Sequence, residues 1–236
     1  MTMPRIAMVF AAGLGTRMRP LTDHTPKPLV RVAGATILDR VLDDLAQAGV
    51  ADAIVNVHHL ADQIEAQLAG RSRPRITISD ERALLLDQGG GVRKVLPQLG
   101  DAPFLICNTD AFWPNAGAAN LAKLASVWNA DAMDAALLLA STKGSVGVDW
   151  DGDFDLGADG RIIRRDGAKP YVYSGVAIIK PQLFAGVTDE VFKLAPFLFA
   201  AAEKGRLFGV AADGLWLHVG TVAAIADAEQ ALLAHS

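Results

Sequence analysis

The chain has 236 residues, of which 51% are apolar and 20% are charged, and its formal net charge at pH 7 is -4. This length is enough for one globular domain with a full hydrophobic core. The negative charge argues against a general nucleic-acid binder, and no apolar run approaches the roughly 18 residues that a membrane-spanning helix needs. Because the start of the chain also lacks the pattern of a signal peptide, we expect a cytoplasmic protein with no membrane or nucleic-acid partner. No protein partner is evident.

The first part of the chain alternates between strand and helix patterns. A short apolar run at 6–10 predicts a buried parallel strand. Helical spacing follows from Ile37 to Leu45 and stops before Gly49, which suits a helix C-terminus. The pattern then continues with a strand at 53–57, a helix at 60–68, strands at 75–79 and 103–107, a helix around 121–128 and a strand at 135–140. This rhythm predicts an α/β fold.

Residues 144–171 break the rhythm with glycines, aspartates and arginines, which indicates loops and short antiparallel strands over a substrate pocket. Regular structure returns as a strand at 173–179, a helix near 192–204, a strand near 208–211 and a terminal helix from Val222. The sequence shows no internal repeat and no appended hexapeptide pattern. One domain is therefore the simplest organisation.

A glycine loop with nearby cations follows the first predicted strand and reads A-A-G-L-G-T-R-M-R-P-L-T-D-H-T-P-K-P. Gly13 and Gly15 lack the Cβ atoms that would keep backbone N–H groups away from phosphate oxygens. Arg17, Arg19 and Lys27 supply positive charge for a triphosphate and for a leaving pyrophosphate. The run lacks both the third glycine of the dinucleotide fingerprint and the G-K-[ST] ending of a P-loop. It therefore predicts a different kind of nucleotide site.

This run resembles the signature of the sugar-1-phosphate nucleotidyltransferases, and the whole chain is most similar to the bacterial N-acetylmuramic acid 1-phosphate uridylyltransferases. The resemblance implies a Rossmann-like nucleotidyltransferase fold with a mixed, mostly parallel central sheet and flanking helices. It implies one domain, 1–236, with a nucleotide-binding half at about 1–115 and a sugar-phosphate-binding half at about 116–236. The implied reaction joins UTP to a sugar 1-phosphate, most closely N-acetylmuramic acid 1-phosphate, and releases pyrophosphate. The implied setting is salvage of cell-wall sugars in peptidoglycan recycling.

Residues for binding the nucleotide are expected in two segments. In the second of them, three successive glycines after Gln88 would let a planar base approach the backbone, and the Gln88 amide can pair with the edge of uracil. The resembling enzymes more often have threonine at this position. Glu81, just upstream, either orients the loop through backbone N–H groups or is a solvated surface carboxylate. The expected nucleotide-binding residues are Ala12, Gly13, Gly15, Thr16, Arg17, Lys27, Gln88 and Gly90.

Asp110 is the principal candidate for a metal ligand, because it follows a predicted buried strand and could meet Mg²⁺ that bridges phosphates. With Arg17 and Lys27 it completes the expected catalytic set. The segment W-L-H-V-G-T resembles a W-x-D-V-G-T motif whose aspartate commonly supplies a second ligand, and here that position is His218. Imidazole suits Mn²⁺, Co²⁺ or Zn²⁺ better than Mg²⁺, but one carboxylate with triphosphate oxygens and water is still an acceptable Mg²⁺ site. We therefore expect Mg²⁺, with Mn²⁺ as a possible substitute. Alternatively, His218 has only a packing or capping role.

Residues for the sugar phosphate are expected in the second half, apart from Asn108, which would face hydroxyl groups. By the resemblance, Gly147, Asp153 and Gly175 would line the sugar pocket. Cys107, the single cysteine, lies in an apolar run and is expected to be a structural strand residue. Two alternatives stay open at this point. One is a guanylyl- or other nucleotidyltransferase acting on a mannose-like, heptose or glucose 1-phosphate, and the other is a nonenzymatic sugar-nucleotide sensor.

Overall fold

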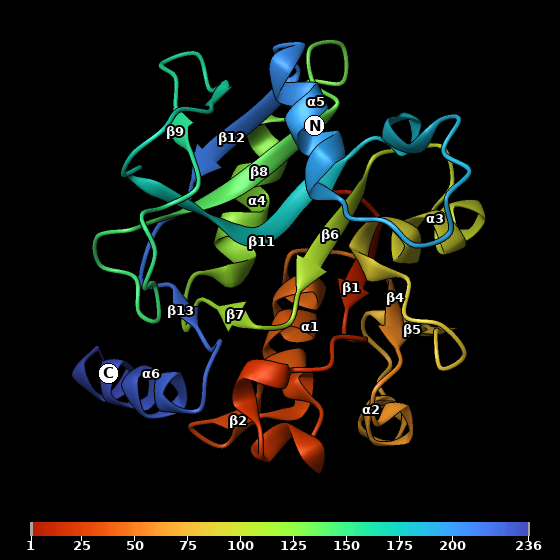
Figure 1. The fold of residues 1–236 in the computed structure, drawn as a ribbon, viewed down its shortest axis with the longest axis vertical. Helices are drawn as coiled ribbons and strands as arrows, with labels where there is room; N and C mark the ends of the chain where they lie inside the picture. Colours follow the sequence, from red (N-terminus) through yellow and green to blue (C-terminus); the bar gives the residue numbers. More distant parts are fainter. Residues whose placement is uncertain (1, 236) are drawn as a thin grey trace.

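The computed structural model describes residues 2–235, and its centre is a seven-stranded sheet (Figure 1). Strand β11 is antiparallel to both of its neighbours, and all other neighbouring strands in this sheet are parallel. The mixed, mostly parallel sheet that was predicted is therefore confirmed. In spatial order the strands are β12 (Leu207–Ala211), β8 (Ala135–Ser141), β11 (Tyr171–Ile179), β6 (Phe104–Asn108), β1 (Ile6–Phe10), β4 (Asp52–Val57) and β5 (Arg75–Asp80).

Helices cover both faces of the sheet, because the strands are apolar on both sides. In β1, for example, Val9 packs in one core cluster and Met8 packs in the other. The cluster that contains Val9 holds the inner faces of α1 (Ile37–Gln47), α2 (Ala61–Leu68) and α4 (Gly117–Val127). The opposite cluster holds the inner faces of α3 (Asp87–Leu99) and α5 (Ala195–Glu203). The remaining helix, α6 (Ala223–Ala234), contacts short strands at the rim.

Short elements connect these layers. Two-residue strands form three small pairs, namely β2 (Arg31–Val32) with β3 (Ala35–Thr36), β7 (Ala111–Phe112) with β13 (Leu217–His218), and β9 (Asp155–Leu156) with β10 (Ile162–Ile163). Short 3-10 turns follow β1 at Thr16–Met18, Leu21–Asp23 and Lys27–Leu29, and another stands at Pro181–Phe184. The predicted break over 144–171 thus contains the β9–β10 pair and its loops.

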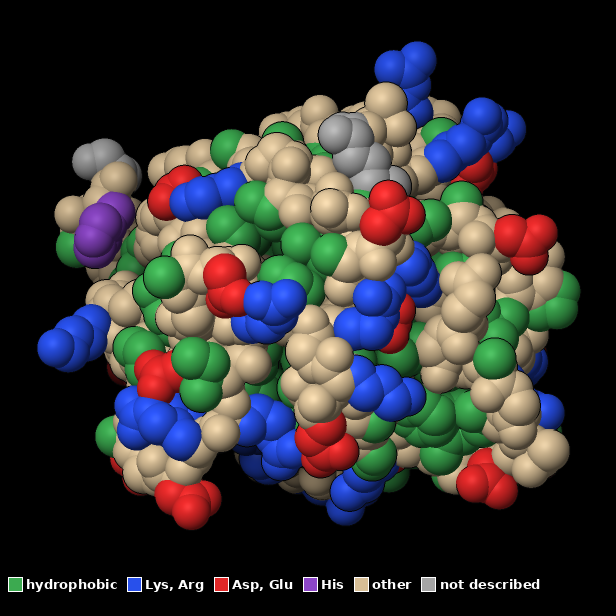
Figure 2. Space-filling model, turned by 90° about the horizontal axis from the view of Figure 1, so that it is seen from above, with side chains coloured by type: hydrophobic (Ala, Val, Ile, Leu, Met, Phe, Trp, Pro, Cys, Tyr) green, Lys and Arg blue, Asp and Glu red, His purple; other side chains and the backbone are tan. Residues whose placement is uncertain are grey.

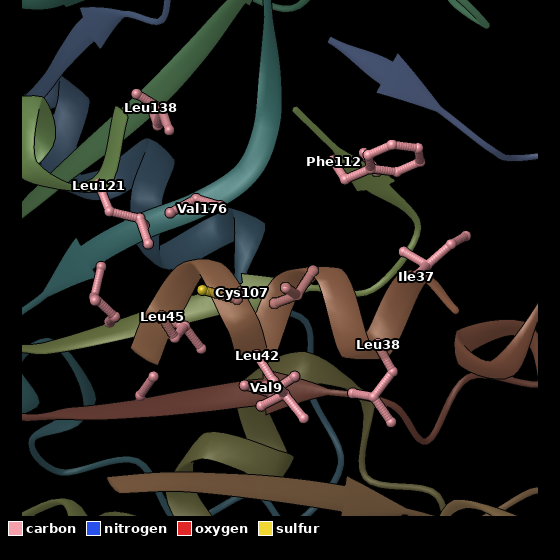
Figure 3. Packing of buried hydrophobic residues seen from close by; sticks show 14 of the residues in the cluster. Val9, Ile37, Leu38, Leu42, Leu45, Cys107, Phe112, Leu121, Leu138 and Val176 are labelled. Carbon is pink, nitrogen blue, oxygen red and sulfur yellow. The ribbon is translucent and has the colours of Figure 1, made fainter. Parts of the chain in front are cut away.

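Helix α1 illustrates how the sequence pattern forms the core. Its first turn is capped by Thr36, whose hydroxyl accepts a hydrogen bond from the backbone N–H of Asp39 at 3.0 Å. Its apolar side chains follow the spacing of one helix face and are buried against β1 and β6 (Figure 3). Full burial of one such leucine contributes about 2 kcal/mol. Cys107 lies in this layer, where burial raises the pKa of its thiol to about 12, in keeping with the expected structural role.

The order of the strands creates a crevice between β1 and β6. From β1 the chain builds β4 and β5 on one side, and it then returns through α3 to place β6 on the other side. Ligands of open α/β sheets bind at such a switch point, outside the carboxyl ends of the strands. The glycine loop after Phe10 and the polar residues after Cys107 meet there.

The surface carries both signs of charge. In Figure 2, Lys and Arg side chains are interspersed with Asp and Glu over the face that is shown. Within residues 2–235, no helix combines the length and the apolar character that crossing a membrane requires.

Candidate active site

A cavity of about 550 Å³ opens at the carboxyl ends of β1, β4 and β6. We call it the first cavity. Its size is typical of sites for small molecules. The residues expected from the sequence that line it are Ala12, Gly13, Gly15, Thr16, Arg17, Lys27, Gln88, Asn108 and Asp110. The structure thus brings one group of candidates together from the glycine loop, the start of α3 and the end of β6.

The two glycines of the loop have different structural tasks. Gly15 has a φ of +62°, and a Cβ there would lie 2.8 Å from Thr22 Cγ2. Its carbonyl accepts a hydrogen bond from the Thr22 hydroxyl at 2.8 Å, which fixes the turn. Gly13 has a φ outside the left-handed region, and a Cβ there would meet no atom within 4 Å. Gly15 therefore shapes the loop, whereas Gly13 leaves open space beside the cavity.

A buried polar network holds the glycine loop in place. The Asn56 side chain accepts a hydrogen bond from the Ala11 N–H at 2.7 Å and donates one to Glu81 Oε1 at 2.9 Å. Glu81 Oε2 in turn accepts the N–H of Leu86 at 3.2 Å, just before α3. Asn56 and Glu81 are only 3% and 2% exposed. Of the two alternatives for Glu81, the structure therefore shows the carboxylate that orders backbone, not the solvated one.

Lys27 and Asp110 form an ion pair at the side of the first cavity. Their Nζ and Oδ2 atoms are 3.0 Å apart, and the side chains are 15% and 28% exposed. Burial alone would raise the pKa of the Asp110 carboxyl, but the polar contact with His218 and the charge of Lys27 outweigh burial and hold that pKa well below its usual range. Asp110 is thus an anion at every pH at which the protein is expected to work.

His218 lies beside Asp110, with its Nε2 atom 3.8 Å from Asp110 Oδ2. Its Nδ1 atom is 3.0 Å from the carbonyl oxygen of Gly147, so Nδ1 carries the proton in that hydrogen bond. Nε2 is then the ring nitrogen that faces Asp110. The ring also stacks on Trp216, with centroids 5.7 Å apart and planes at 9°. Packing and a ligand-like orientation therefore occur together at His218.

Gly147 approaches the backbone of β13 so closely that a Cβ would lie 2.0 Å from the His218 carbonyl oxygen. Its φ is +78°. In this structure Gly147 borders neither the first cavity nor the second cavity described below. What it does is to position His218, through close packing and through the hydrogen bond to Nδ1.

The two arginines of the glycine loop differ in their surroundings. Arg19 forms an ion pair with Asp23 at 3.2 Å. Arg17 is exposed, lines the first cavity and has no ion pair or hydrogen bond to any side chain in residues 2–235. Its guanidinium is therefore available to a bound anion, and that of Arg19 already has a partner.

The glycines after Gln88 are part of a helix and not of an open loop. They lie in the first turns of α3, where Gly89 and Gly90 donate their N–H groups to the carbonyl of Phe192 at 3.0 and 3.2 Å. A Cβ on Gly90 would lie 2.2 Å from the Glu190 carbonyl oxygen. Gly90 therefore faces the 190–192 segment rather than the cavity, and its open backbone, the reason for expecting a base contact, is absent.

A second cavity, of about 730 Å³, borders the first at Gln88, which lines both. Asp153 lies in its wall, and both carboxylate oxygens already have partners: Oδ1 accepts the Trp150 indole N–H at 3.1 Å, and Oδ2 accepts the N–H of Tyr173 at 2.8 Å. Asp153 therefore organises this wall. The other residues that line the second cavity are Gly152, Phe154, Arg164, Arg165, Asp166, Lys169, Tyr173, Leu194, Ala195, Leu198 and Phe199.

Gly175 packs against Asn108, which lines the first cavity. Gly175 has a φ of +86°, and a Cβ there would lie 2.7 Å from Asn108 Cβ. Asn108 Oδ1 accepts a hydrogen bond from Gln88 Nε2 at 2.9 Å. Gly175 itself lines neither cavity, so its observed task is to leave room for the Asn108 side chain.

Sequence reasoning missed Asn56 altogether. The available signal was a polar residue at the carboxyl end of an apolar predicted strand, the same signal that singled out Asp110. Val191, which also lines the first cavity, had no such signal, because it belongs to a segment far along the chain.

Comparisons with known proteins agree with this geometry. Residues 7–178 match the MobA-like NTP transferase domain family. The N-acetylmuramate alpha-1-phosphate uridylyltransferase of Caulobacter vibrioides is 46% identical over 235 residues, covering 97% of both chains. The enzyme of the same name from Neisseria meningitidis serogroup B is 37% identical over 94% of this chain and 96% of its own. A solved UDP-glucose pyrophosphorylase complexed with UDP-glucose has a TM-score of 0.80 at 14% identity, covers 99% of this chain and 100% of its own, and supports the fold.

Proposed function

This chain belongs to the MobA-like NTP transferase domain family, within it to the N-acetylmuramate alpha-1-phosphate uridylyltransferases, and we propose from that premise how its cavities carry out the transfer. The protein is a nucleotidyltransferase. Its proposed substrates are UTP and N-acetylmuramate 1-phosphate, and its products are UDP-N-acetylmuramate and pyrophosphate. The observation that carries the proposal is the first cavity itself, where Gly13, Arg17, Lys27 and Asp110 meet at the switch point of the sheet.

In the proposed reaction, a phosphate oxygen of the sugar 1-phosphate attacks the α-phosphorus of UTP. A new P–O bond forms, the bond from the α-phosphorus to the oxygen that bridges to the β-phosphorus breaks, and pyrophosphate leaves with that electron pair. The nucleophile is already an anion, so no general base is needed. The protein has to align two polyanions and offset their repulsion.

The residues of the first cavity suit these tasks. The open side of Gly13 admits phosphate oxygens to the backbone, and the unpartnered Arg17 guanidinium can bind the triphosphate. The Lys27 ammonium is placed to turn from Asp110 towards the α-phosphate, where negative charge develops. Once Lys27 binds phosphate, the Asp110 carboxylate loses its partner and can hold a divalent cation.

The side chains present fit such a cation. Asp110 supplies an anionic oxygen, and the Nε2 atom of His218 lies 3.8 Å from it, so both atoms could contact one ion. Residues 2–235 contain no cluster of three or more acidic, His or Cys groups for a metal, so phosphate oxygens and water would complete the set. When bound, Mg²⁺ or Mn²⁺ would neutralise charge on the phosphates. The nitrogen ligand favours Mn²⁺ over Mg²⁺.

Metal binding can be tested without turnover, by measuring free Mn²⁺ by electron paramagnetic resonance in the presence of UTP. We expect Asp110→Asn to abolish tight binding and His218→Ala to weaken it by about 10-fold, with His24→Ala as an unchanged control. Equal Mn²⁺ affinity in wild type and His218→Ala would show that His218 is not a metal ligand and has only a packing role.

Gln88 is the proposed reader of the base. Its Nε2 donates to Asn108, which leaves its side-chain oxygen available to the N3–H of uracil. The reaction is proposed to take place in the cytoplasm, where UTP is made, as part of the salvage of cell-wall sugars. This setting rests on the substrates of the relatives that match the chain over its length.

The proposal is tested by pyrophosphate release with each nucleoside triphosphate and with 1-phosphates of N-acetylmuramate, N-acetylglucosamine, glucose and mannose, in Mg²⁺ and in Mn²⁺. We expect the highest kcat/KM for UTP with N-acetylmuramate 1-phosphate. A preference for GTP with mannose 1-phosphate would keep the reaction and replace the substrates. Nucleotide binding without turnover for any pair would support the sensor and contradict the proposal.

A further inference from the structure

The second cavity combines an aromatic wall with cations, which is the chemistry of a site for an acidic sugar. Phe154 and Phe199 meet edge to face in this wall, with ring centroids 6.4 Å apart. Leu198 and the ring of Tyr173 extend the apolar surface. The apolar faces of sugar rings and their acetyl groups pack on such surfaces.

The three cations of the second cavity differ in how far the protein already satisfies them. Arg165 pairs with Asp155. Arg164 lies over the ring of Phe199, 3.8 Å from its centroid, and only approaches Glu203 at 3.9 Å. Lys169 Nζ donates to the carbonyl of Gly167 at 2.9 Å and forms no ion pair with residues 2–235.

Lys169 is also the most firmly placed of the three. It is half-buried, whereas both arginines are exposed. Its N–H donates to the Asp151 carbonyl at 2.7 Å. The Lys169 carbonyl oxygen lies so close to Gly152 that a Cβ at position 152 would be 2.4 Å from it. The close contact therefore requires glycine at position 152. The backbone that carries this cation is therefore held against the 151–153 loop.

Among residues 2–235, neither of the two acidic residues that line the second cavity forms an ion pair with Lys169 or Arg164. Both carboxylate oxygens of Asp153 are used by Trp150 and Tyr173. Asp166 is exposed at the rim, and the hydrogen bond in which it takes part runs from Arg165 to its backbone carbonyl. An incoming carboxylate would therefore find Lys169 and Arg164 without competition from a buried acid.

We propose that Lys169, assisted by Arg164, binds the carboxylate of the acidic sugar and so selects N-acetylmuramate 1-phosphate over uncharged hexosamine phosphates. This inference rests on the proposed function. N-acetylmuramate differs from N-acetylglucosamine by a lactyl ether, which carries one carboxylate. A sugar whose phosphate lies in the first cavity can reach the second one past Gln88, which lines both. A charge-assisted hydrogen bond to Lys169 then distinguishes the two sugars.

The test measures the activity and the sugar binding of wild type and of variants with two sugar 1-phosphates. Wild type and Lys169→Gln are compared for kcat/KM with UTP and for calorimetric binding of each 1-phosphate in the presence of a nonhydrolysable UTP analogue. We expect Lys169→Gln to lose roughly 10- to 100-fold with N-acetylmuramate 1-phosphate and less than about 3-fold with N-acetylglucosamine 1-phosphate. Lys169→Arg, which keeps the charge, should retain most of the discrimination. Lys123→Gln makes the same charge change at a half-buried site outside both cavities, where Lys123 pairs with Asp213, and should match wild type.

Equal losses with both sugars would overturn the inference, because they would place Lys169 on the phosphate or in a general role. Unchanged binding of both sugars would overturn it as well. Absence of wild-type turnover with N-acetylmuramate 1-phosphate would instead be a failure of the proposed function, so the two failures can be told apart.

Discussion

The two cavities lie side by side, but the chain builds them from different materials. The first cavity stands on the ends of parallel strands, and it contains a buried polar network, Asn56–Glu81, and an ion pair, Lys27–Asp110. The second cavity stands on the antiparallel side of the sheet, and exposed arginines follow the β9–β10 pair in its wall. From this difference we infer that the residues of the first cavity are constrained by the transfer reaction, whereas those of the second cavity determine which sugar is bound.

Of the substitutions considered for the two cavities, replacement of Lys27 should lower turnover most. Loss of a cation that acts on the developing charge should lower kcat by about 100- to 1,000-fold in Lys27→Ala, measured by pyrophosphate release. The matched control is Arg19→Ala, because Arg19 already pairs with Asp23 at 3.2 Å. Near wild-type turnover of Lys27→Ala would remove Lys27 from the proposed chemistry.

Removing Asn56 tests whether the first cavity depends on its buried network. Asn56→Ala leaves the Ala11 N–H and the Glu81 carboxylate without a buried partner. The free energy of unfolding in urea should fall by about 2–3 kcal/mol. Asn129→Ala, in an exposed turn, should change it by less than about 0.5 kcal/mol. A small loss in Asn56→Ala would show that the loop is held by its turns alone.

The two loop glycines separate binding from folding within the first cavity. A methyl group at position 13 has open space, so Gly13→Ala should fold normally but weaken UTP binding by about 10-fold through occupation of the phosphate cradle. At Gly15, with a φ of +62°, alanine should cost about 1–2 kcal/mol of stability. Calorimetry with UTP and urea unfolding measure the two effects. The reverse pattern would contradict the assignment of Gly13 to the ligand.

These cases show what the sequence could and could not predict. Gly13 and Arg17 follow the predicted strand at 6–10, and Asp110 follows the predicted strand at 103–107, so the rule that ligands bind at the carboxyl ends of parallel strands places all three at one end of the sheet. The hydrogen bond from Asn56 to Glu81 forms because β4 lies beside β5. That strand pairing cannot be deduced from the spacing of residues along the chain. The surroundings of Gly90 were equally out of reach, because the segment that packs on it, 190–192, is distant in sequence.

The second cavity was still harder to predict. The sequence placed a sugar pocket somewhere in 144–171, and the structure confirms a cavity partly lined by that segment. It did not single out Lys169, Phe154 or Phe199. These residues come together because the 151–153 loop is hydrogen-bonded to Lys169 and Tyr171 and because α5 packs in the same core cluster as Phe154. The roles expected for Asp153, Gly147 and Gly175 stay predictions about the bound state, since their observed contacts are to the protein itself.

A site outside both cavities should give the smallest effect. Desolvation by burial raises the pKa of Asp44 from 3.8 to about 6, although a hydrogen bond from the Ala118 N–H partly lowers that pKa. The stability that the neutral carboxyl supplies is therefore present below pH 3.8 and is lost as the pH rises to about 6. Asp44→Asn should raise the Tm at pH 7.5 by a few degrees, and by less at pH 5, with kcat/KM unchanged. A Tm gain that is the same at both pH values would contradict this linkage.

The most direct test of the account is to follow UTP binding and product formation separately in wild type and in Asp110→Asn. With UTP, N-acetylmuramate 1-phosphate and Mn²⁺, wild type should form UDP-N-acetylmuramate and pyrophosphate in equal amounts. Asp110→Asn should still bind UTP through the glycine loop and Arg17, but it should form neither product. Equal turnover by the two proteins, or UTP bound by wild type without any product, would contradict uridylyl transfer in the first cavity.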